Sequence, residues 1–239
     1  MPADLTRTSD GLPSARSDSL DVDTFLAQAG RSIQDRGRLI FALDATMSRQ
    51  PTWDRACRLQ GEMFTAVEGI GSLAVQLLYY RGFSECRASK WVGDAAALRD
   101  LMTRIDCRGG HTQISKVLAH ARRETGRHRV NALVFIGDAV EEGVDDLCRA
   151  AGELGVLGLP CFMVQEGRES TVETAFREIA RLSGGAYLRF DEGSAAALSN
   201  LLRAVAAFAS GGYAALERDI SQEGRLLLEQ MRRPGATGP

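Results

Sequence analysis

The clearest pattern in the chain is a run of apolar residues that is followed directly by polar ones. Five apolar residues, 39–43, lead without a polar break into Asp44, and hydroxyl side chains follow at Thr46 and Ser48. A short apolar run bounded by charged residues is typical of a central parallel strand covered on both faces, although periodicity alone does not exclude a buried helical segment. Ligands gather at the carboxyl ends of such strands, so these three polar side chains stand where a ligand would bind.

The rest of the chain alternates between short apolar runs and segments with apolar residues at helical spacing. Further strands are predicted at residues 72–80, 85–91, 132–138, 160–164 and 186–190. Helices are predicted at residues 53–70, 94–105, 144–154, 171–182 and 195–208. A further helix is predicted to begin at Thr112 or just beyond it. The link after residue 80 is short enough for a hairpin, so residues 85–91 are expected to form an antiparallel edge strand.

This alternation predicts the fold class. Strands that alternate with helices of about 10 to 15 residues favour right-handed crossovers and a parallel sheet. We therefore expect an α/β fold, a Rossmann-like three-layer sandwich. Its six-stranded sheet would be mostly parallel with one antiparallel edge strand, and helices would cover both faces.

The two ends of the chain have a different character from the alternating part. Residues 1–20 are polar and predicted to be a disordered tail, and residues 21–36 allow a short N-terminal helix. The main domain is expected at residues 37–210, a C-terminal helix within 211–233, and a frayed tail at 234–239.

The C-terminal helix is predicted to run from Tyr213 to about Arg232 with an apolar seam. Its apolar residues are Leu216, Ile220, Leu227 and Met231. Such a seam docks on its own domain, on a second copy of the chain or on another partner, so an oligomer through this helix stays open. Gly224 is expected to weaken the helix by about 1 kcal/mol relative to Ala.

Composition narrows the classes of function. A net charge of −2 and an isoelectric point near 6.0 give neither a basic field for nucleic acid nor a polybasic membrane anchor. The 5 cysteines form no Cys-x-x-Cys pair, so neither a disulfide framework nor a zinc knuckle is indicated. The first residues do not resemble a signal peptide and no apolar run is long enough to span a membrane, so we expect a cytoplasmic protein.

Polar residues at two strand ends suggest a metal site. Asp44, Thr46 and Ser48 follow the first strand, Thr112 follows a Gly-Gly-His sequence, and Asp138 ends the fourth strand. With the third strand at an edge, the first and fourth strands are neighbours at the point where strand order reverses, so their loops converge. Two carboxylates and three hydroxyls form an all-oxygen set that favours Mg²⁺, Mn²⁺ or Ca²⁺.

Taken singly, these residues have simpler explanations. Thr112 is a suitable N-cap for the helix that follows it. The acidic residues Glu141, Glu142, Asp145 and Asp146 would complement the dipole at the start of the next helix.

Taken together, the pattern resembles the von Willebrand factor type A domain and its metal-ion-dependent adhesion site. That site has Asp-x-Ser-x-Ser, then a Thr, then an Asp, and the resemblance covers about residues 37–210. It implies that hydroxyls ligate Mg²⁺, that the Asp residues bind mainly through water, and that an open position accepts a partner's carboxylate. The residues that would fill these roles are Asp44, Thr46, Ser48, Thr112 and Asp138. The chain is also similar to bacterial, cytoplasmic, stand-alone domains of this type.

The sequence departs from the family pattern near the site. Thr46 stands in place of the first Ser, Arg49 in place of a common Met, and Ala139 in place of the Gly that follows the last Asp. Arg49 could compete with a cation or grip an acidic partner. His111 and Glu141 are further candidates for the rim of the site.

Three functions follow from these observations. The first is a non-enzymatic protein-interaction module that binds a partner's Asp or Glu through Mg²⁺, by analogy as an adaptor of a larger ATPase or chaperone assembly. The second is a Mg²⁺-dependent phosphohydrolase or phosphotransferase with Asp44 as nucleophile. Position 46 is Thr where haloacid-dehalogenase-type enzymes have a second Asp, and neither Lys90 nor Lys116 lies at a strand end. The third is a metal-free scaffold that acts through the C-terminal helix.

Overall fold

One mixed sheet organises the part of the chain that the structure describes. The computed structural model describes residues 36–46, 73–190 and 195–232, all within the unit Arg36–Pro239. The strands are β1 (Gly37–Asp44), β2 (Leu73–Arg81), β3 (Glu85–Ala88), β4 (Ala132–Gly137), β5 (Cys161–Glu166) and β6 (Ala186–Phe190). Their order is β3-β2-β1-β4-β5-β6, and only β3 runs antiparallel to its neighbour. The predicted fold class is confirmed.

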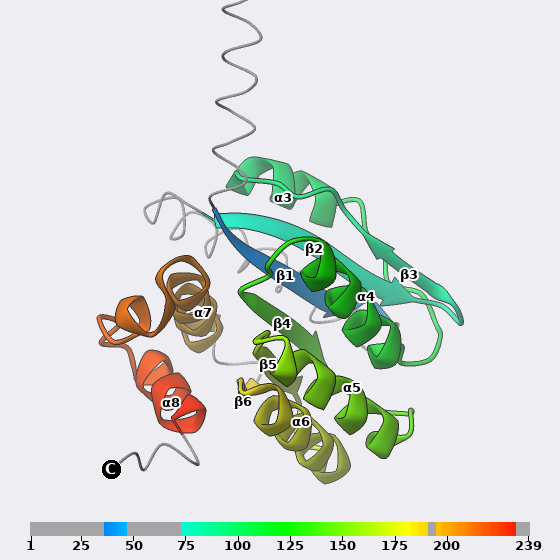
Figure 1. Cartoon of the computed structure of the whole chain (residues 1–239). Coiled ribbons are helices and arrows are strands. Elements are labelled where there is room, and N and C mark those ends of the chain that lie inside the picture. The colour runs from blue at the N-terminus through cyan, green and yellow to red at the C-terminus, as the bar shows by residue number, and fades with distance from the viewer. Residues whose placement is uncertain (1–35, 47–72, 191–194, 233–239) are drawn as a thin grey trace, which may run out of the picture. The chain divides into compact units, whose positions relative to one another are not determined.

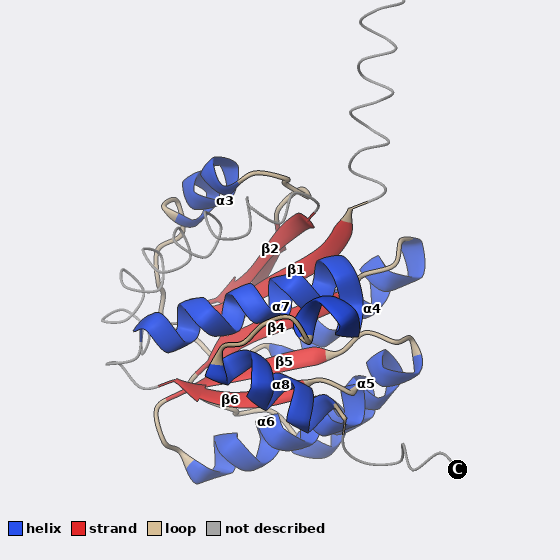
Figure 2. Ribbon diagram, turned by 90° about the vertical axis from the view of Figure 1, so that its left-hand side faces the viewer, coloured by secondary structure: helices blue, strands red, loops and turns tan. Residues whose placement is uncertain are grey.

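The helices cover both faces of this sheet (Figures 1 and 2). They are α3 (Ala95–Met102), α4 (Ile114–Arg127), α5 (Val144–Val156), α6 (Ser170–Ser183), α7 (Ala195–Leu216) and α8 (Gln222–Met231). Apolar residues of α4, α5 and α6 form one core with the sheet, and those of α3, α7 and α8 form the other. The layers are therefore helices, sheet and helices.

β1 occupies the centre of the sheet because its side chains are apolar on both faces. Leu39, Phe41 and Leu43 point into the core beneath α7, while Ile40 and Ala42 point into the core beneath α4 to α6. A strand buried on both faces needs such a continuous apolar run. The strand interpretation of this run is confirmed, and β1 lies between β2 and β4 with Asp44 at its carboxyl end.

The antiparallel edge strand is also confirmed, although it is shorter than the predicted 85–91. β3 follows β2 through a turn in which Gly82 has a φ of 60°, a conformation that glycine adopts without strain. Beyond β3 the chain returns to β2, where Val92 and Val75 exchange backbone hydrogen bonds of 2.8 Å.

The prediction of one C-terminal helix over 213–232 is wrong. The chain stays helical past a kink at Gly212 until Leu216, and α8 begins only at Gln222. Ser221 caps α8 by accepting a 3.0 Å hydrogen bond from the Gly224 amide. A Cβ at Gly224 would lie 2.9 Å from the Asp219 carboxyl carbon, so glycine permits a close approach that the pattern did not indicate.

The predicted apolar seam packs partly on the chain's own core. Leu216 and Leu227 are fully buried with α7, whereas Ile220 is 83% exposed in the turn between α7 and α8. The Gln230 side chain donates to the Tyr187 carbonyl at 2.8 Å and accepts from the Tyr187 amide at 2.9 Å. α8 therefore covers the outer edge of β6.

Several predictions fall outside the described residues. They are the tail at 1–20, most of the N-terminal helix at 21–36, the crossover helix at 53–70, Ser48, Arg49 and the tail at 234–239. The division of the chain into domains stays a prediction. Among the described helices, none is both long and apolar enough to cross a membrane.

Candidate functional site

Asp44 is fully buried at the carboxyl end of β1. One carboxylate oxygen, Oδ1, accepts a 2.8 Å hydrogen bond from the Thr46 amide, and the other, Oδ2, accepts one of 2.9 Å from the Tyr80 hydroxyl. Burial raises the pKa of Asp44, hydrogen bonds from Thr46 and Tyr80 lower it, and the charge of Asp138 raises it again. Tyr80 was missed by sequence reasoning because it ends an ordinary apolar strand, and only the β1–β2 register places it opposite Asp44.

Asp138 follows β4 and lies close to Asp44. A Cβ at Gly137 would lie 2.8 Å from the Phe135 ring, so glycine leaves room for that ring, and it would lie at an ordinary contact distance of 3.7 Å from the Asp44 Cβ. The Oδ1 atom of Asp138 is buried and has no hydrogen-bond partner among the described residues. A buried carboxylate oxygen without a partner is uncommon in a folded protein and calls for an explanation.

Thr112 is tied to the loop that carries Asp138, and it is not the N-cap of α4. The N-cap position belongs to Gln113, which makes no side-chain cap hydrogen bond. The Thr112 hydroxyl accepts from the Glu141 amide at 3.0 Å, and the Glu141 carboxylate accepts from the Thr112 amide at 2.8 Å. This reciprocal pair joins the loop before α4 to the loop after β4.

Glu142 supplies the carboxylate that the start of α4 needs. Its oxygens accept hydrogen bonds of 2.5 Å from the Ile114 amide and 2.9 Å from the Ser115 amide. An anion at a helix N-terminus satisfies free amides and complements the helix dipole. The prediction that Glu141 and Glu142 belong to the first turn of the next helix is wrong, whereas Asp145 and Asp146 do lie in the first turn of α5.

The loop at residues 106–113 is held against the end of β1. The Arg108 amide donates a 3.0 Å hydrogen bond to the Ala45 carbonyl, which extends the sheet by an isolated parallel bridge between Thr46 and Arg108. Gly110 packs on the β2–β3 turn so closely that a Cβ there would lie 2.0 Å from the Gly82 carbonyl oxygen. A glycine at this position is therefore required by packing.

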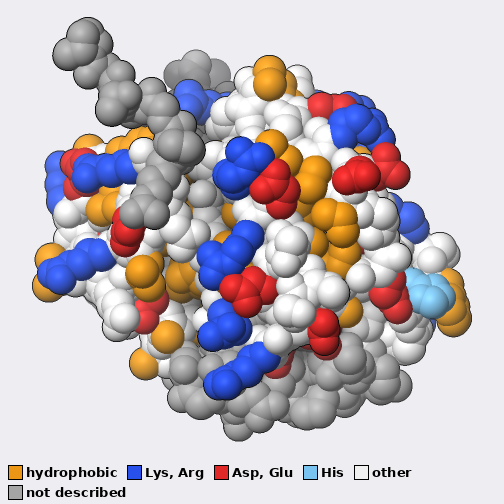
Figure 3. Space-filling view, turned by 90° about the horizontal axis from the view of Figure 1, so that it is seen from below, with side chains coloured by type: hydrophobic (Ala, Val, Ile, Leu, Met, Phe, Trp, Pro, Cys, Tyr) orange, Lys and Arg blue, Asp and Glu red, His pale blue; other side chains and the backbone are white. Residues whose placement is uncertain are grey.

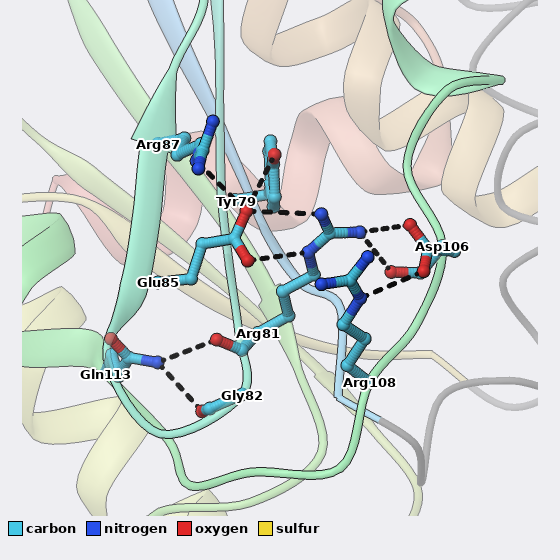
Figure 4. Close-up of polar contacts among 8 residues, drawn as sticks. All are labelled: Tyr79, Arg81, Gly82, Glu85, Arg87, Asp106, Arg108 and Gln113. Atoms are coloured by element: carbon cyan, nitrogen blue, oxygen red, sulfur yellow. Dashed lines mark hydrogen bonds and ion pairs between the residues drawn. The ribbon is translucent and has the colours of Figure 1, made fainter.

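Charged side chains fasten the same loop to β2 and β3 (Figure 4). The Arg81 guanidinium contacts the carboxylates of Asp106 and Glu85, and it also donates to the Asp106 carbonyl at 2.9 Å. Arg108 pairs with Asp106 at 3.0 Å. These ion pairs place the loop that carries Thr112 beside the end of β1.

The predicted rim residues His111 and Glu141 contact each other. The His111 Nδ1 lies 3.2 Å from a Glu141 carboxylate oxygen, and both side chains are about half exposed or more, at 64% and 49%. On its other side, the His111 ring packs edge-on against the Phe83 ring with centroids 5.3 Å apart. Phe83 was not singled out from the sequence.

The oxygen atoms at this edge are a suitable set for a hard divalent cation. Asp44 and Asp138 supply carboxylates of like charge, Thr46 lies two residues after Asp44, and Thr112 is joined to the Asp138 loop. The described residues contain no group of three or more His, Cys, Asp or Glu side chains arranged to hold a metal, so hydroxyl oxygens would have to complete the shell. Hydroxyl, carboxylate and water oxygens are the ligands that Mg²⁺, Mn²⁺ and Ca²⁺ accept, and the unpartnered Asp138 oxygen fits that need.

Comparison with known proteins identifies the fold. No family model and no curated protein matches this sequence. Among solved structures, the SpRpn10 VWA domain is 13% identical with a TM-score of 0.56, over 69% of this chain and 94% of that one. An aerotolerance-related membrane protein from Bacteroides fragilis is 19% identical with a TM-score of 0.55, over 69% of this chain and 96% of that one.

A third similar structure has a metal in its site. Proximal thread matrix protein 1 from the mussel byssus, described with a zinc-occupied MIDAS motif, is 14% identical with a TM-score of 0.57, over 73% of this chain and 47% of that one. Identities this low establish the architecture alone. By its strand order, its antiparallel edge strand and these likenesses, the described part of the chain has the von Willebrand factor type A fold.

Proposed function

We propose that this protein is a protein-interaction module whose binding site is completed by a divalent cation at the carboxyl ends of β1 and β4. Thr46, Thr112 and Asp138 would hold the cation, with Ser48, outside the described residues, as a further ligand. Asp44 would bind it through water, because both of its oxygens already accept hydrogen bonds. Mg²⁺ is the first choice for an all-oxygen set, with Mn²⁺ and Ca²⁺ as alternatives. When bound, the cation supplies a positive centre with an open position for a partner's oxygen.

The observation that carries this proposal is the state of Asp138. Its buried Oδ1 has no partner in the described part of the chain, and its charge acts unfavourably on the buried Asp44. Two carboxylates that repel each other in a buried place are stabilised by a cation more than by any neutral partner. The mussel protein described with a zinc-occupied MIDAS motif supports divalent metal binding by a protein of this fold.

The partner we propose presents an Asp or Glu side chain. A carboxylate is the simplest anionic oxygen ligand for an open position on a hard cation, and a charge-assisted contact of this kind is stronger than a neutral hydrogen bond. By analogy of fold, the module would serve as an adaptor in a larger assembly, such as one built around an ATPase or a chaperone.

The structure gives the enzymatic alternative little support. A nucleophilic Asp needs a free oxygen that can reach a substrate. Both oxygens of Asp44 accept hydrogen bonds, and the side chain has no exposed surface. A scaffold that acts through the C-terminal helix is also less well supported. Leu227 packs in the core and Gln230 bonds to Tyr187, so these side chains of the helix do not face a partner.

Titration of Mg²⁺ and Mn²⁺ into the metal-stripped protein, followed by calorimetry, tests the proposal. We expect Asp138→Asn to weaken cation binding by at least about tenfold, because one anionic ligand is lost. The metal-free variant should be as stable as the wild type or more stable, by about 0.5–1 kcal/mol, because Asp44 loses a repulsive neighbour. Thermal melting measures this second effect.

Asp100→Asn is the matched control, since Asp100 is an exposed residue of α3, away from the site. It should bind the cation as the wild type does. Equal cation affinity in the wild type and in Asp138→Asn would refute the proposed site.

A further inference from the structure

An exposed aromatic side chain stands beside the candidate metal site. Phe83 is at the tip of the turn between β2 and β3 and is 77% exposed. Residues at such turns are usually Gly, Asn, Asp, Ser or Pro, which the turn geometry favours. Gly82 with its positive φ meets that need, so nothing in the turn requires an aromatic residue at position 83.

The turn that carries Phe83 is held rigidly from the loop before α4. The Gly82 carbonyl accepts from the Gln113 side chain at 3.1 Å and from the His111 amide at 3.3 Å. The Lys116 ammonium donates to the Ser84 carbonyl at 3.0 Å. Figure 4 shows the Gln113 amide pointing at the turn, beneath the ion pairs of Arg81. A fixed backbone on both sides of an exposed ring lowers the entropy that binding must overcome.

Side-chain contacts connect Phe83 to a candidate metal ligand. Its ring packs on His111, His111 contacts Glu141, and Glu141 exchanges hydrogen bonds with Thr112. Phe83 therefore lies on the same surface as the proposed cation. Exposed aromatic side chains held in place next to polar contacts are typical anchors of protein interfaces.

The two large apolar residues that are more exposed than Phe83 in the described chain do not share this position. Val156 is 90% exposed and Ile220 is 83% exposed. Val156 ends α5, which returns from the carboxyl end of β4, and Ile220 follows α7, which returns from β6. Both residues therefore lie towards the amino ends of the strands, away from the candidate site, and they serve as controls for exposure alone.

We infer that Phe83 is the apolar anchor of the partner-binding surface, so that the partner presents a large apolar side chain next to the acidic one. This inference rests on the proposed function, since the carboxylate would be bound by the cation and the apolar side chain by Phe83. The partner is thus a protein segment in which Asp or Glu has an aromatic or large aliphatic neighbour. Specificity would come from the pair, because the cation alone accepts any accessible carboxylate.

An array of immobilised hexapeptides tests this inference. Each peptide has Asp or Ala at a central position and every residue type at the two flanking positions, and binding is compared in Mg²⁺ and in chelator. In Mg²⁺ the wild type should bind Asp peptides with a large apolar neighbour about tenfold more strongly than those with Ser, a modest gain for burying one such side chain. Phe83→Ser should lose this preference and keep the Mg²⁺-dependent preference for Asp over Ala.

The control variants Val156→Ser and Ile220→Ser should behave as the wild type, and thermal melting should show all three variants folded. An apolar preference that survives in Phe83→Ser, or one missing from the wild type while Asp is still preferred, would overturn the inference and leave the proposed function standing. No Mg²⁺-dependent preference for Asp in the wild type would instead overturn the proposed function. In that case, a Phe83-dependent apolar preference would still support an anchor at this turn.

Discussion

The outer edge of β6 and the carboxyl ends of β1 and β4 are two boundaries of the sheet, and they differ in whether their polar groups have hydrogen-bond partners. At the outer edge of β6, the backbone amide and carbonyl of Tyr187 are both bonded by Gln230, and the Tyr187 hydroxyl donates to Gln165 at 2.7 Å. At the carboxyl ends of β1 and β4, Asp138 keeps a buried oxygen that no described residue contacts by a hydrogen bond, and it lies near the like charge of Asp44. Among the described residues, these polar groups at the first boundary all have partners, and one at the second does not.

Charged side chains at the β6 side are also paired. Figure 3 views the side on which α6 and α8 lie, and it shows basic and acidic side chains interspersed. Glu173 pairs with Arg177 at 2.8 Å and with Arg189 at 3.6 Å, beside a cavity of about 410 Å³. This cavity is lined by matched charges, so its size alone does not make it the functional site. The comparison teaches that unmet polar groups and cavity volume point to different places in this fold, and that the two signals must be weighed separately.

The largest effect should come from the loop that carries Thr112. A Cβ introduced by Gly110→Ala would meet the Gly82 backbone, which cannot rotate away, so the loop must move. We expect a loss of about 2–3 kcal/mol in the free energy of unfolding, together with a loss of cation affinity. Urea denaturation and calorimetric titration measure the two effects.

The neighbouring glycine provides the control for that substitution. A Cβ at Gly109 would meet nothing within 4 Å, so Gly109→Ala should change neither quantity. Equal behaviour of the two variants would show that the loop yields easily and that its close packing does not position Thr112.

A smaller effect, confined to stability, is expected at the β6 edge. Gln230→Ala removes both bonds to Tyr187 and leaves an amide and a carbonyl without partners. We expect a loss of about 2 kcal/mol in the free energy of unfolding, with cation affinity unchanged. Gln222→Ala, at the exposed first position of the same helix, should have little effect in urea denaturation. A change in cation affinity in Gln230→Ala would show that the β6 edge and the candidate cation site are not independent of each other.

Much of the fold was predictable because its signals are local. The unbroken apolar run of β1, the short link into β3 and the glycine that ends α6 each act within a few residues of the chain. The end of the chain was harder. The backbone does leave helical geometry at Gly212, as the two glycines indicate, but the helical segment beyond it ends at Leu216 and α8, which packs on the core, begins only at Gln222.

In the candidate site, too, the residues with local sequence signals could be predicted and those that depend on tertiary contacts could not. Asp44, Thr46, Thr112 and Asp138 could be chosen from strand ends and loop composition, and the structure brings the ends of β1 and β4 together. Tyr80, Glu142 and Phe83 could not, because their roles depend on contacts between separate loops and strands. Glu142 precedes α5, but its carboxylate accepts hydrogen bonds from the first amides of α4.

The smallest effect should come from the hydrogen bond that holds Asp44 in place. Tyr80→Phe keeps the ring and removes the donor to Asp44 Oδ2, so we expect a loss of about 1.5 kcal/mol in the free energy of unfolding. Tyr79→Phe is the matched control, since the Tyr79 hydroxyl donates to Glu85 over a longer distance of 3.4 Å in a partly buried place, and it should cost less.

The pH dependence of this loss identifies its cause. The Tyr80 hydroxyl lowers the pKa of Asp44 because it donates to the ionised carboxylate, whereas burial raises that pKa. Removing the donor raises the folded-state pKa further, and stability is then lost as pH rises through it, because the ionised form has lost a bond that the protonated form does not need. The difference in unfolding free energy between Tyr80→Phe and the wild type should therefore be larger at about pH 8 than at about pH 5, as followed by urea denaturation. A difference independent of pH would mean that the hydroxyl stabilises the core by packing and that Asp44 is held by Thr46 alone.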